Sequence, residues 1–334
     1  MINLKNDYNT IGDKKILNEL LKYSDEKYIG YGEDIKTKEL NTLVNNICNK
    51  EVDTYVLAGG TLSNVIGLNQ MLRYPYEAVI TVESSHINVH ETGAIEATGH
   101  KIIYTPNILG KIDISKIKDT FYKYQDNHMV MPKALYLANA TELGEVYTLE
   151  ELKEISKICK ELNLYFFIDG ARLHQALASA NYKLSDVAAL CDMFYLGGTK
   201  LGLPYGELLI IVNEELKKNF KYLIKNRLGM FAKGFVGAIM FLAFIKDDYY
   251  LSLAKKTIDL ANIIREELND YLIYPNTTNQ VFIKINNNDI NKLKEKIEFE
   301  VWENTNSYTV IRLVTSINTT KEEIDECVKI IKNL

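Results

Sequence analysis

Cysteine is scarce in this 334-residue sequence, and its four cysteines lie far apart with no Cys-x-x-Cys pair. This spacing excludes a disulfide framework and a zinc site built from thiolates, and we expect no metal site. Long apolar runs are also missing: the longest, residues 237–245, falls far short of the roughly 20 residues that a membrane-spanning helix needs. The first residues lack the apolar stretch of a signal peptide. We therefore expect a cytoplasmic protein that does not enter a membrane.

Arginine is also scarce, since only five of the 39 lysine and arginine residues are arginine. The formal net charge is −5, and the basic residues form no stripe of the kind that follows a phosphate backbone. A nucleic-acid partner is therefore not expected. With 47% hydrophobic and 25% charged residues the composition is that of a globular protein, and 334 residues are enough for two domains.

What the sequence does contain is an alternation of short apolar runs with amphipathic segments between residues 50 and 212. This alternation predicts an α/β fold with a mainly parallel sheet of seven strands and helices on both faces. Several of the apolar runs lack polar alternation, which is typical of strands buried on both faces. The expected strands are residues 54–57, 78–82, 101–104, 134–137, 164–168, 193–196 and 208–212.

The clearest helix is expected after Thr148, because Thr148 and Glu151 match a capping box and apolar residues follow at helical spacing. Past residue 246 the pattern changes. It predicts a long helix over 249–269, strands at 281–285, 299–302 and 310–314, and a final helix capped by Thr319 or Thr320. We therefore expect a large α/β domain with an N-terminal arm, residues 1–245, and a smaller α+β domain, residues 246–334.

Ligands of open α/β sheets bind beyond the carboxyl ends of the strands, and four of the turns expected there carry unusual residues. The first turn is Gly59-Gly60-Thr61, where the free amides of a helix start could hold a phosphate, although such a turn can also be merely tight. The second contains His86, whose ring can stack on a planar group, transfer a proton or only satisfy a local hydrogen bond.

The other two turns contain an acid and a lysine. Asp169 ends a strand and Arg172 follows it, so the carboxylate can contact a cofactor or a metal, or the two can form a structural ion pair. Lys200 follows a buried strand among small residues, where a lysine is a candidate Schiff-base nucleophile. Together the four turns supply what pyridoxal 5'-phosphate needs: a helix start for its phosphate, a ring to stack on, a carboxylate for its pyridinium nitrogen and an amine for its aldehyde.

With these motifs the sequence resembles the low-specificity threonine aldolases of the β-eliminating lyase group, which are pyridoxal-phosphate enzymes of the aspartate aminotransferase fold (fold type I). The resemblance extends over nearly the whole chain. It is carried by residues 5–8 (Lys-Asn-Asp-Tyr), 31–34 (Tyr-Gly-Glu-Asp), 59–61 with Asn64, 85–88 (Ser-His-Ile-Asn), 141–147, 169–172 (Asp-Gly-Ala-Arg), 198–200 and 312–316.

The resemblance implies how the cofactor is held. Lys200 would form the covalent bond to its aldehyde, and Asp169 would pair with the pyridine nitrogen. His86 would stack on the ring, and Gly60 and Thr61 would bind the phosphate.

The resemblance also implies a substrate site. Arg172 would lie near the phenolic oxygen of the cofactor and the substrate carboxylate, and Arg312 would hold that carboxylate through two bonds. Asn6 stands where the family has a serine that helps to bind the carboxylate. His128, by spacing alone, falls near a second active-site histidine of the family, and it could equally be a loop histidine.

The activity that the resemblance implies is retro-aldol cleavage of threonine or allo-threonine to glycine and an aldehyde. His86, or a water that it positions, would take the β-hydroxyl proton, with His128 as the second choice. The same groups could instead expel a β-leaving group and give ammonia and a keto acid, and racemisation or decarboxylation would need similar anchors. A non-catalytic pyridoxal-fold binding protein or a structural subunit is the alternative from another class. The resemblance further implies a homodimer or tetramer with shared active sites, to which residues 31–34 contribute.

Overall fold

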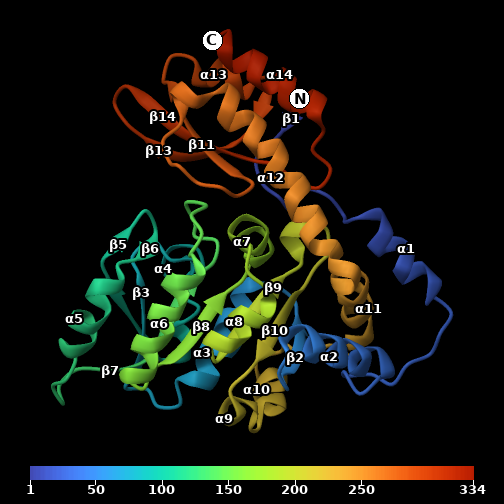
Figure 1. Ribbon diagram of the computed structural model, residues 1–334, viewed down its shortest axis with the longest axis vertical. Coiled ribbons are helices and arrows are strands. Elements are labelled where there is room, and N and C mark those ends of the chain that lie inside the picture. Colours follow the sequence, from blue (N-terminus) through green and yellow to red (C-terminus); the bar gives the residue numbers. More distant parts are fainter.

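A seven-stranded sheet lies at the centre of the larger part of the computed structural model, which describes residues 1–334 (Figure 1). The antiparallel strand β10 lies between β2 and β9, and the other strands run parallel to one another. In spatial order the strands are β2 (Asp53–Leu57), β10 (Glu207–Ile211), β9 (Met193–Gly197), β8 (Tyr165–Asp169), β7 (Met131–Ala138), β3 (Glu77–Val82) and β4 (Lys101–Thr105).

Helices cover both faces of this sheet, and each face has its own apolar core. Core residues from α1 (Lys14–Lys22), α2 (Ile35–Cys48), α6 (Leu149–Glu161), α7 (Leu173–Ala180), α8 (Leu184–Leu190) and α11 (Gly234–Ile245) belong to one face. Core residues from α3 (Gly60–Met71), α4 (His86–Val89), α9 (Glu214–Lys217) and α10 (Phe220–Asn226) belong to the other. The predicted α/β class, with a mainly parallel seven-stranded sheet and helices on both faces, is confirmed.

A three-stranded antiparallel sheet forms the smaller part, which lies above the large sheet in Figure 1. Its central strand β14 (Tyr308–Val314) is flanked by β11 (Gln280–Asn286) and β13 (Glu300–Asn304). The helices α12 (Tyr249–Glu267) and α14 (Lys321–Lys332) supply residues to its core, and α13 (Ile290–Lys294) lies between β11 and β13 in the chain. Strand β1 (Ile2–Asn3) pairs with β12 (Ile297–Glu298), so the N-terminal arm expected in the large domain is joined to the smaller part. The boundary near residue 246 stays a prediction.

Helix boundaries follow the local signals. Thr148 and Glu151 form the predicted capping box at the start of α6, and each accepts a backbone N–H at the helix start. The final helix is capped by Thr320 rather than Thr319, because Thr319 accepts a hydrogen bond from the backbone N–H of Ser316. None of the helices combines the length and the apolar character needed to span a lipid bilayer.

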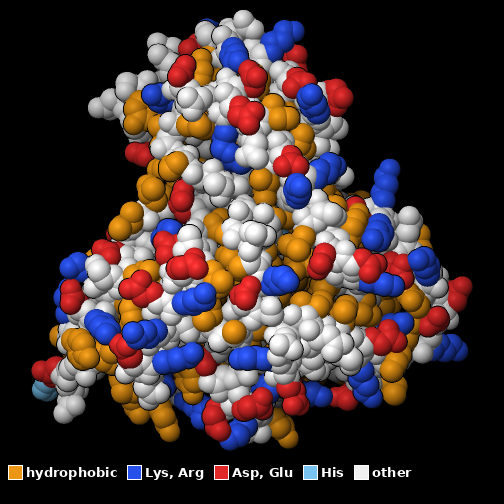
Figure 2. Space-filling model, in the orientation of Figure 1, with side chains coloured by type: hydrophobic (Ala, Val, Ile, Leu, Met, Phe, Trp, Pro, Cys, Tyr) orange, Lys and Arg blue, Asp and Glu red, His pale blue; other side chains and the backbone are white.

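The carboxyl ends of the parallel strands meet along one side of the large sheet. From this side Arg172 contacts Asp7 of the N-terminal segment, and Asp7 in turn contacts Asn279 of the smaller part. On the face seen in Figure 2, basic and acidic side chains are interspersed and neither sign forms a continuous stripe. The short remaining elements, β5 (Asn107–Ile108), β6 (Lys111–Ile112) and α5 (Ile117–Tyr122), lie between β4 and β7 in the chain.

Candidate active site

Asp169 is the buried centre of the site, at the carboxyl end of the central strand β8, and only 3% of its surface is exposed. One carboxylate oxygen accepts hydrogen bonds from Tyr136 Oη (2.5 Å) and Asn64 Nδ2 (3.0 Å). The other accepts from Tyr195 Oη and from the backbone N–H of Ala171. Burial alone would raise the pKa of Asp169, but nearby His86 and these hydrogen bonds hold the pKa below its ordinary value. The side chain is therefore kept as an anion.

His86 lies beside this carboxylate, at the start of α4 after strand β3. Its Nδ1 is 2.8 Å from Glu91 Oε1, and its backbone N–H donates to Glu142 Oε1 at 2.8 Å. Glu91 Oε1 also accepts a hydrogen bond from Asn64 Nδ2, at 2.7 Å. Two carboxyl groups therefore contact His86: Glu91 at its ring and Glu142 at its backbone N–H. Burial raises the pKa of Glu142 to about 7.

Lys200 lies in a short 3₁₀ turn between β9 and β10. Burial and the positive charge of Arg172 lower the pKa of Lys200, which makes its amine a better nucleophile near neutral pH. Glu207, at the start of β10 and 4% exposed, interacts with this lysine and accepts a hydrogen bond from the backbone N–H of Gly198 at 2.9 Å. Burial raises the pKa of Glu207, and the charge of Lys200 opposes the increase.

The turn after β2 leads directly into α3, whose N-cap Gly59 has no side-chain hydrogen bond to the first amides. A Cβ atom placed on Gly59 would meet nothing within 4 Å, and one on Gly60 would lie 3.0 Å from Tyr195 Oη. Thr61, one residue further, is exposed. The start of α3 therefore offers free N–H groups to an anion in open space next to the Asp169 network.

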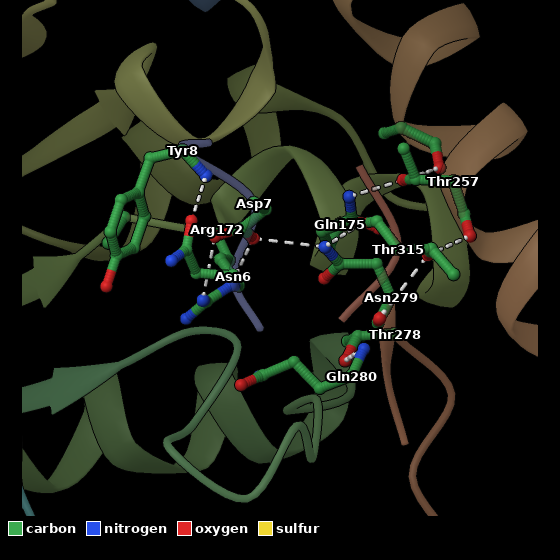
Figure 3. A network of polar contacts seen from close by, with 12 residues as sticks. Asn6, Asp7, Tyr8, Arg172, Gln175, Thr257, Thr278, Asn279, Gln280 and Thr315 are labelled. Carbon is green, nitrogen blue, oxygen red and sulfur yellow. Dashed lines mark hydrogen bonds and ion pairs between the residues drawn. The ribbon is translucent and has the colours of Figure 1, made fainter. Parts of the chain in front are cut away.

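Arg172 is buried and faces the N-terminal segment (Figure 3). Its Nε and Nη2 donate to the two carboxylate oxygens of Asp7, at 2.8 and 3.0 Å, and Asn279 Nδ2 also donates to Asp7. Burial alone would raise the pKa of Asp7, but Arg172 holds it at about 2. The alternative of an ion pair between Asp169 and Arg172 is wrong, because Asp169 is occupied by Asn64 and the two tyrosines while Arg172 pairs with Asp7.

Arg312 comes from β14, the central strand of the smaller sheet, so the alternative of a solvated edge residue is wrong. Its Nη1 makes one long hydrogen bond, to Gln280 Oε1 at 3.4 Å, and its buried Nε has no partner. The guanidinium lies 5.2 Å from the ring centroid of Trp302. Burial and the positive charge of Arg172 lower the pKa of Arg312, which indicates two arginines in the same region. Neighbouring cations with an unpaired donor are suited to an anionic ligand.

Of the two remaining predicted residues, Asn6 lies next to the site and His128 lies away from it. Asn6 adjoins Asp7, and its side chain accepts a hydrogen bond from the backbone N–H of Tyr8 at 3.1 Å. His128 is exposed in the turn before β7, at the opposite end of that strand from the site, so the structure does not bring it to the other residues within one chain. His90 is instead the histidine next to His86, with ring centroids 5.3 Å apart.

Several residues of the site carry no recognisable signal in the sequence. Tyr136 and Tyr195 lie inside strands and look like packing residues, although a buried tyrosine hydroxyl needs a partner. Glu91 and Glu207 are single acids outside the motifs that identify the four turns. Asp7 belongs to the motif at residues 5–8, but its pairing with a residue 165 positions away has no local signal.

Comparison with known proteins places this geometry in a family. The family model described as β-eliminating lyase matches residues 17–288. The low-specificity L-threonine aldolase of Pseudomonas aeruginosa is 30% identical over 274 residues, which cover 80% of this chain and 79% of the relative. A solved structure of threonine aldolase from Leishmania major superposes with a TM-score of 0.97 at 37% identity, over 100% of this chain and 99% of that chain.

A more distant structure, a putative histidinol-phosphate aminotransferase from Erwinia carotovora, has a TM-score of 0.75 at 13% identity, covers 99% of this chain and 95% of that chain, and shows the fold alone. The fold and the site thus define an α/β enzyme of the aspartate aminotransferase-like class, fold type I. The chain belongs to the β-eliminating lyase family.

Proposed function

We propose that this chain is a pyridoxal-phosphate-dependent aldehyde-lyase that cleaves threonine or allo-threonine to glycine and an aldehyde. The observation that carries the proposal is the closeness of two groups in a chain of this family: the anionic Asp169 ends strand β8, and Lys200 follows the adjacent parallel strand β9. A buried acid and an amine of lowered pKa that interact electrostatically are typical of an active site.

The residues present fit pyridoxal phosphate. The uncapped start of α3, with Gly60 and Thr61, would hold the phosphate in the open space in front of it. Asp169 would hold the protonated pyridine nitrogen, and Lys200 would hold the aldehyde carbon. When bound, the cofactor supplies an electron sink for the pair of electrons released when the Cα–Cβ bond breaks.

The side chains that would hold the substrate are cationic. Arg312 has an unpaired Nε, and Arg172 is the second guanidinium of the region, although Asp7 already accepts from two of its nitrogens. Asn6 could add an amide contact next to Asp7. We assign the substrate carboxylate to Arg312 first and to Arg172 and Asn6 second.

His86 would take the proton of the substrate β-hydroxyl, directly or through a water. The engaged ring nitrogen of His86 is Nδ1, which leaves Nε2 for the substrate. His128 is the weaker candidate because it lies in an exposed turn, whereas the ring of His90 lies next to that of His86.

Product analysis tests the proposed function directly. With the cofactor-loaded protein and L-threonine or L-allo-threonine, we expect equal amounts of glycine and acetaldehyde by chromatography. Ammonia with a keto acid would instead identify β-elimination, the second candidate, which the family description keeps open. Loss of carbon dioxide or a change of configuration without cleavage would contradict both reactions.

Replacing Arg312 by lysine separates substrate binding from packing. Lysine keeps the charge but loses the planar pair of donors, and one charge-assisted bond is worth roughly 1.5–3 kcal/mol, or about ten- to a hundredfold in kcat/KM. We expect Arg312→Lys to raise KM for every amino-acid substrate while the absorbance of the bound cofactor is unchanged. The matched control is Arg73→Lys at an exposed arginine. Unaltered kinetics in Arg312→Lys would leave the carboxylate to Arg172 and Asn6.

The proposal includes a homo-oligomer, dimer or tetramer, with shared sites. A pair of exposed aromatic side chains supports it: Tyr222 is 79% exposed and Tyr31 is 52% exposed. Tyr31 and Tyr222 border the same hollow, and the ammonium of Lys225 lies 4.8 Å from the centroid of the Tyr31 ring. Exposed apolar clusters of this kind are typical of protein interfaces.

A further inference from the structure

We propose that Glu91 is a positioning residue that keeps the ring proton of His86 on Nδ1, so that Nε2 is available to accept a proton. The inference rests on the proposed function for what His86 does with Nε2, but the position of the ring proton is a property of the protein that can be measured whatever the reaction.

The buried carboxylate of Glu91 contacts the partly exposed ring of His86. Glu91 Oε1 lies 2.8 Å from His86 Nδ1. The Glu91 side chain is completely buried, while 35% of the His86 side chain is exposed. One side of the ring is therefore anchored inside the protein, and the rest of the ring is partly open.

The hydrogen bonds of Glu91 fix the direction of this contact. An ionised carboxylate only accepts hydrogen bonds, so Nδ1 must be the donor. Oε1 also accepts from Asn64 Nδ2 at 2.7 Å, and the same amide nitrogen donates to Asp169 Oδ2 at 3.0 Å. Asn64 thus links Glu91 to the carboxylate that would hold the pyridine nitrogen. In the Ser-His-Asp triad, a buried aspartate orients the catalytic histidine in the same way, by accepting a hydrogen bond from Nδ1.

Glu91 is not suited to a purely structural role. Its second oxygen, Oε2, is buried without a hydrogen-bond partner, and so is Oδ1 of Asn64. A buried acceptor without a partner costs stability, and an isolated charge costs more. The melting temperature of a variant without the carboxylate therefore reports what the two hydrogen bonds to Oε1 contribute to stability, separately from kcat.

The test compares two substitutions at this position. Glu91→Leu removes the acceptor, whereas Glu91→Gln can keep an oxygen in the place of Oε1, where it can still accept from Nδ1 and Asn64. We expect Glu91→Leu to lower kcat by about 10²–10⁴, the usual contribution of a general base, with little change in KM or in cofactor binding. Glu91→Gln should restore most of the activity. Glu96→Gln, at an exposed glutamate of the next turn, is the matched control.

Long-range ¹H–¹⁵N NMR of the cofactor-loaded protein reads the tautomer without reference to activity. The chain has only five histidines, and the signal of His86 can be assigned by its loss in His86→Gln. We expect Nδ1–H in the wild type and in Glu91→Gln, and a shift toward Nε2–H in Glu91→Leu. Nε2–H in the wild type would overturn the proposal, as would an unchanged tautomer or unchanged kcat in Glu91→Leu.

The outcomes also separate this proposal from the proposed function. If the wild type does not cleave threonine but shows the expected tautomers, the role of Glu91 stands and the reaction is different. If threonine is cleaved and the wild-type tautomer is Nε2–H, the reaction stands and Glu91 does not position His86. Nε2–H in the wild-type spectrum would overturn the proposal even if Glu91→Leu does not fold, and Glu91→Gln then supplies the comparison of kcat.

Discussion

Replacing Lys200 by alanine should abolish threonine cleavage, with a loss of roughly 10⁴-fold or more, because no other amine can form the covalent bond to the cofactor. The physical reason lies in the surroundings of Lys200: burial and Arg172 lower its pKa, so its amine is neutral more readily than that of a surface lysine. The variant should also lose the adduct that borohydride traps between protein and cofactor.

The fold should survive this substitution. Lys200 lies in a region that already contains the cation Arg172, so removal of its charge relieves repulsion as well as removing attraction to Glu207. Lys153→Ala, at a lysine with 56% side-chain exposure on α6, is the control and should keep full activity. Undiminished cleavage by Lys200→Ala, measured as glycine release, would contradict the assignment.

The second large effect is expected at Asp169. Asp169→Asn keeps the shape but removes the charge that would keep the pyridine nitrogen protonated, and we expect kcat to fall by about 10²–10³, as for the loss of one preorganised electrostatic contact. Alanine would be a less clear test, because it would leave Tyr136, Tyr195 and Asn64 without their shared acceptor.

Two measurements separate the electron sink from cofactor binding in Asp169→Asn. The borohydride-trapped adduct at Lys200 should still form, whereas the rate of glycine release should fall. The matched control is Asp119→Asn, at an aspartate whose side chain is 63% exposed. A variant with the wild-type rate would mean that another acid keeps the nitrogen protonated.

The sequence predicts the strands of this fold well for a physical reason. Strands buried on both faces are apolar along most of their length, and the interior strands β3, β9 and β10 are buried at every residue. The parallel arrangement brings the carboxyl ends of β3, β8 and β9 to the same side of the sheet, which is why Asp169, Lys200 and His86 can be placed together from the sequence alone.

The partners of those residues are harder to predict, because they meet only in three dimensions. Tyr136 and Tyr195 come from the strands on either side of Asp169, and inside an apolar strand a tyrosine differs from a packing phenylalanine by one oxygen. His128 shows the converse: spacing along the sequence places it near the site, but it precedes its strand instead of following it. Sequence patterns therefore locate residues that follow a strand, and they do not locate residues that depend on a distant partner.

The pairing of Asp7 with Arg172 and Asn279 has a consequence for how the protein is made. Asp7 leaves the ribosome early, but Arg172 lies 165 residues later and Asn279 lies 272 residues later. Closing loops of this length costs entropy before any contact compensates for it, so contacts between such distant residues form slowly. The carboxylate that fixes Arg172 therefore acquires its full set of partners only after Asn279 has been synthesised. Until then, the N-terminal segment lacks the hydrogen bond from Asn279 to Asp7 that helps to hold it beside Arg172.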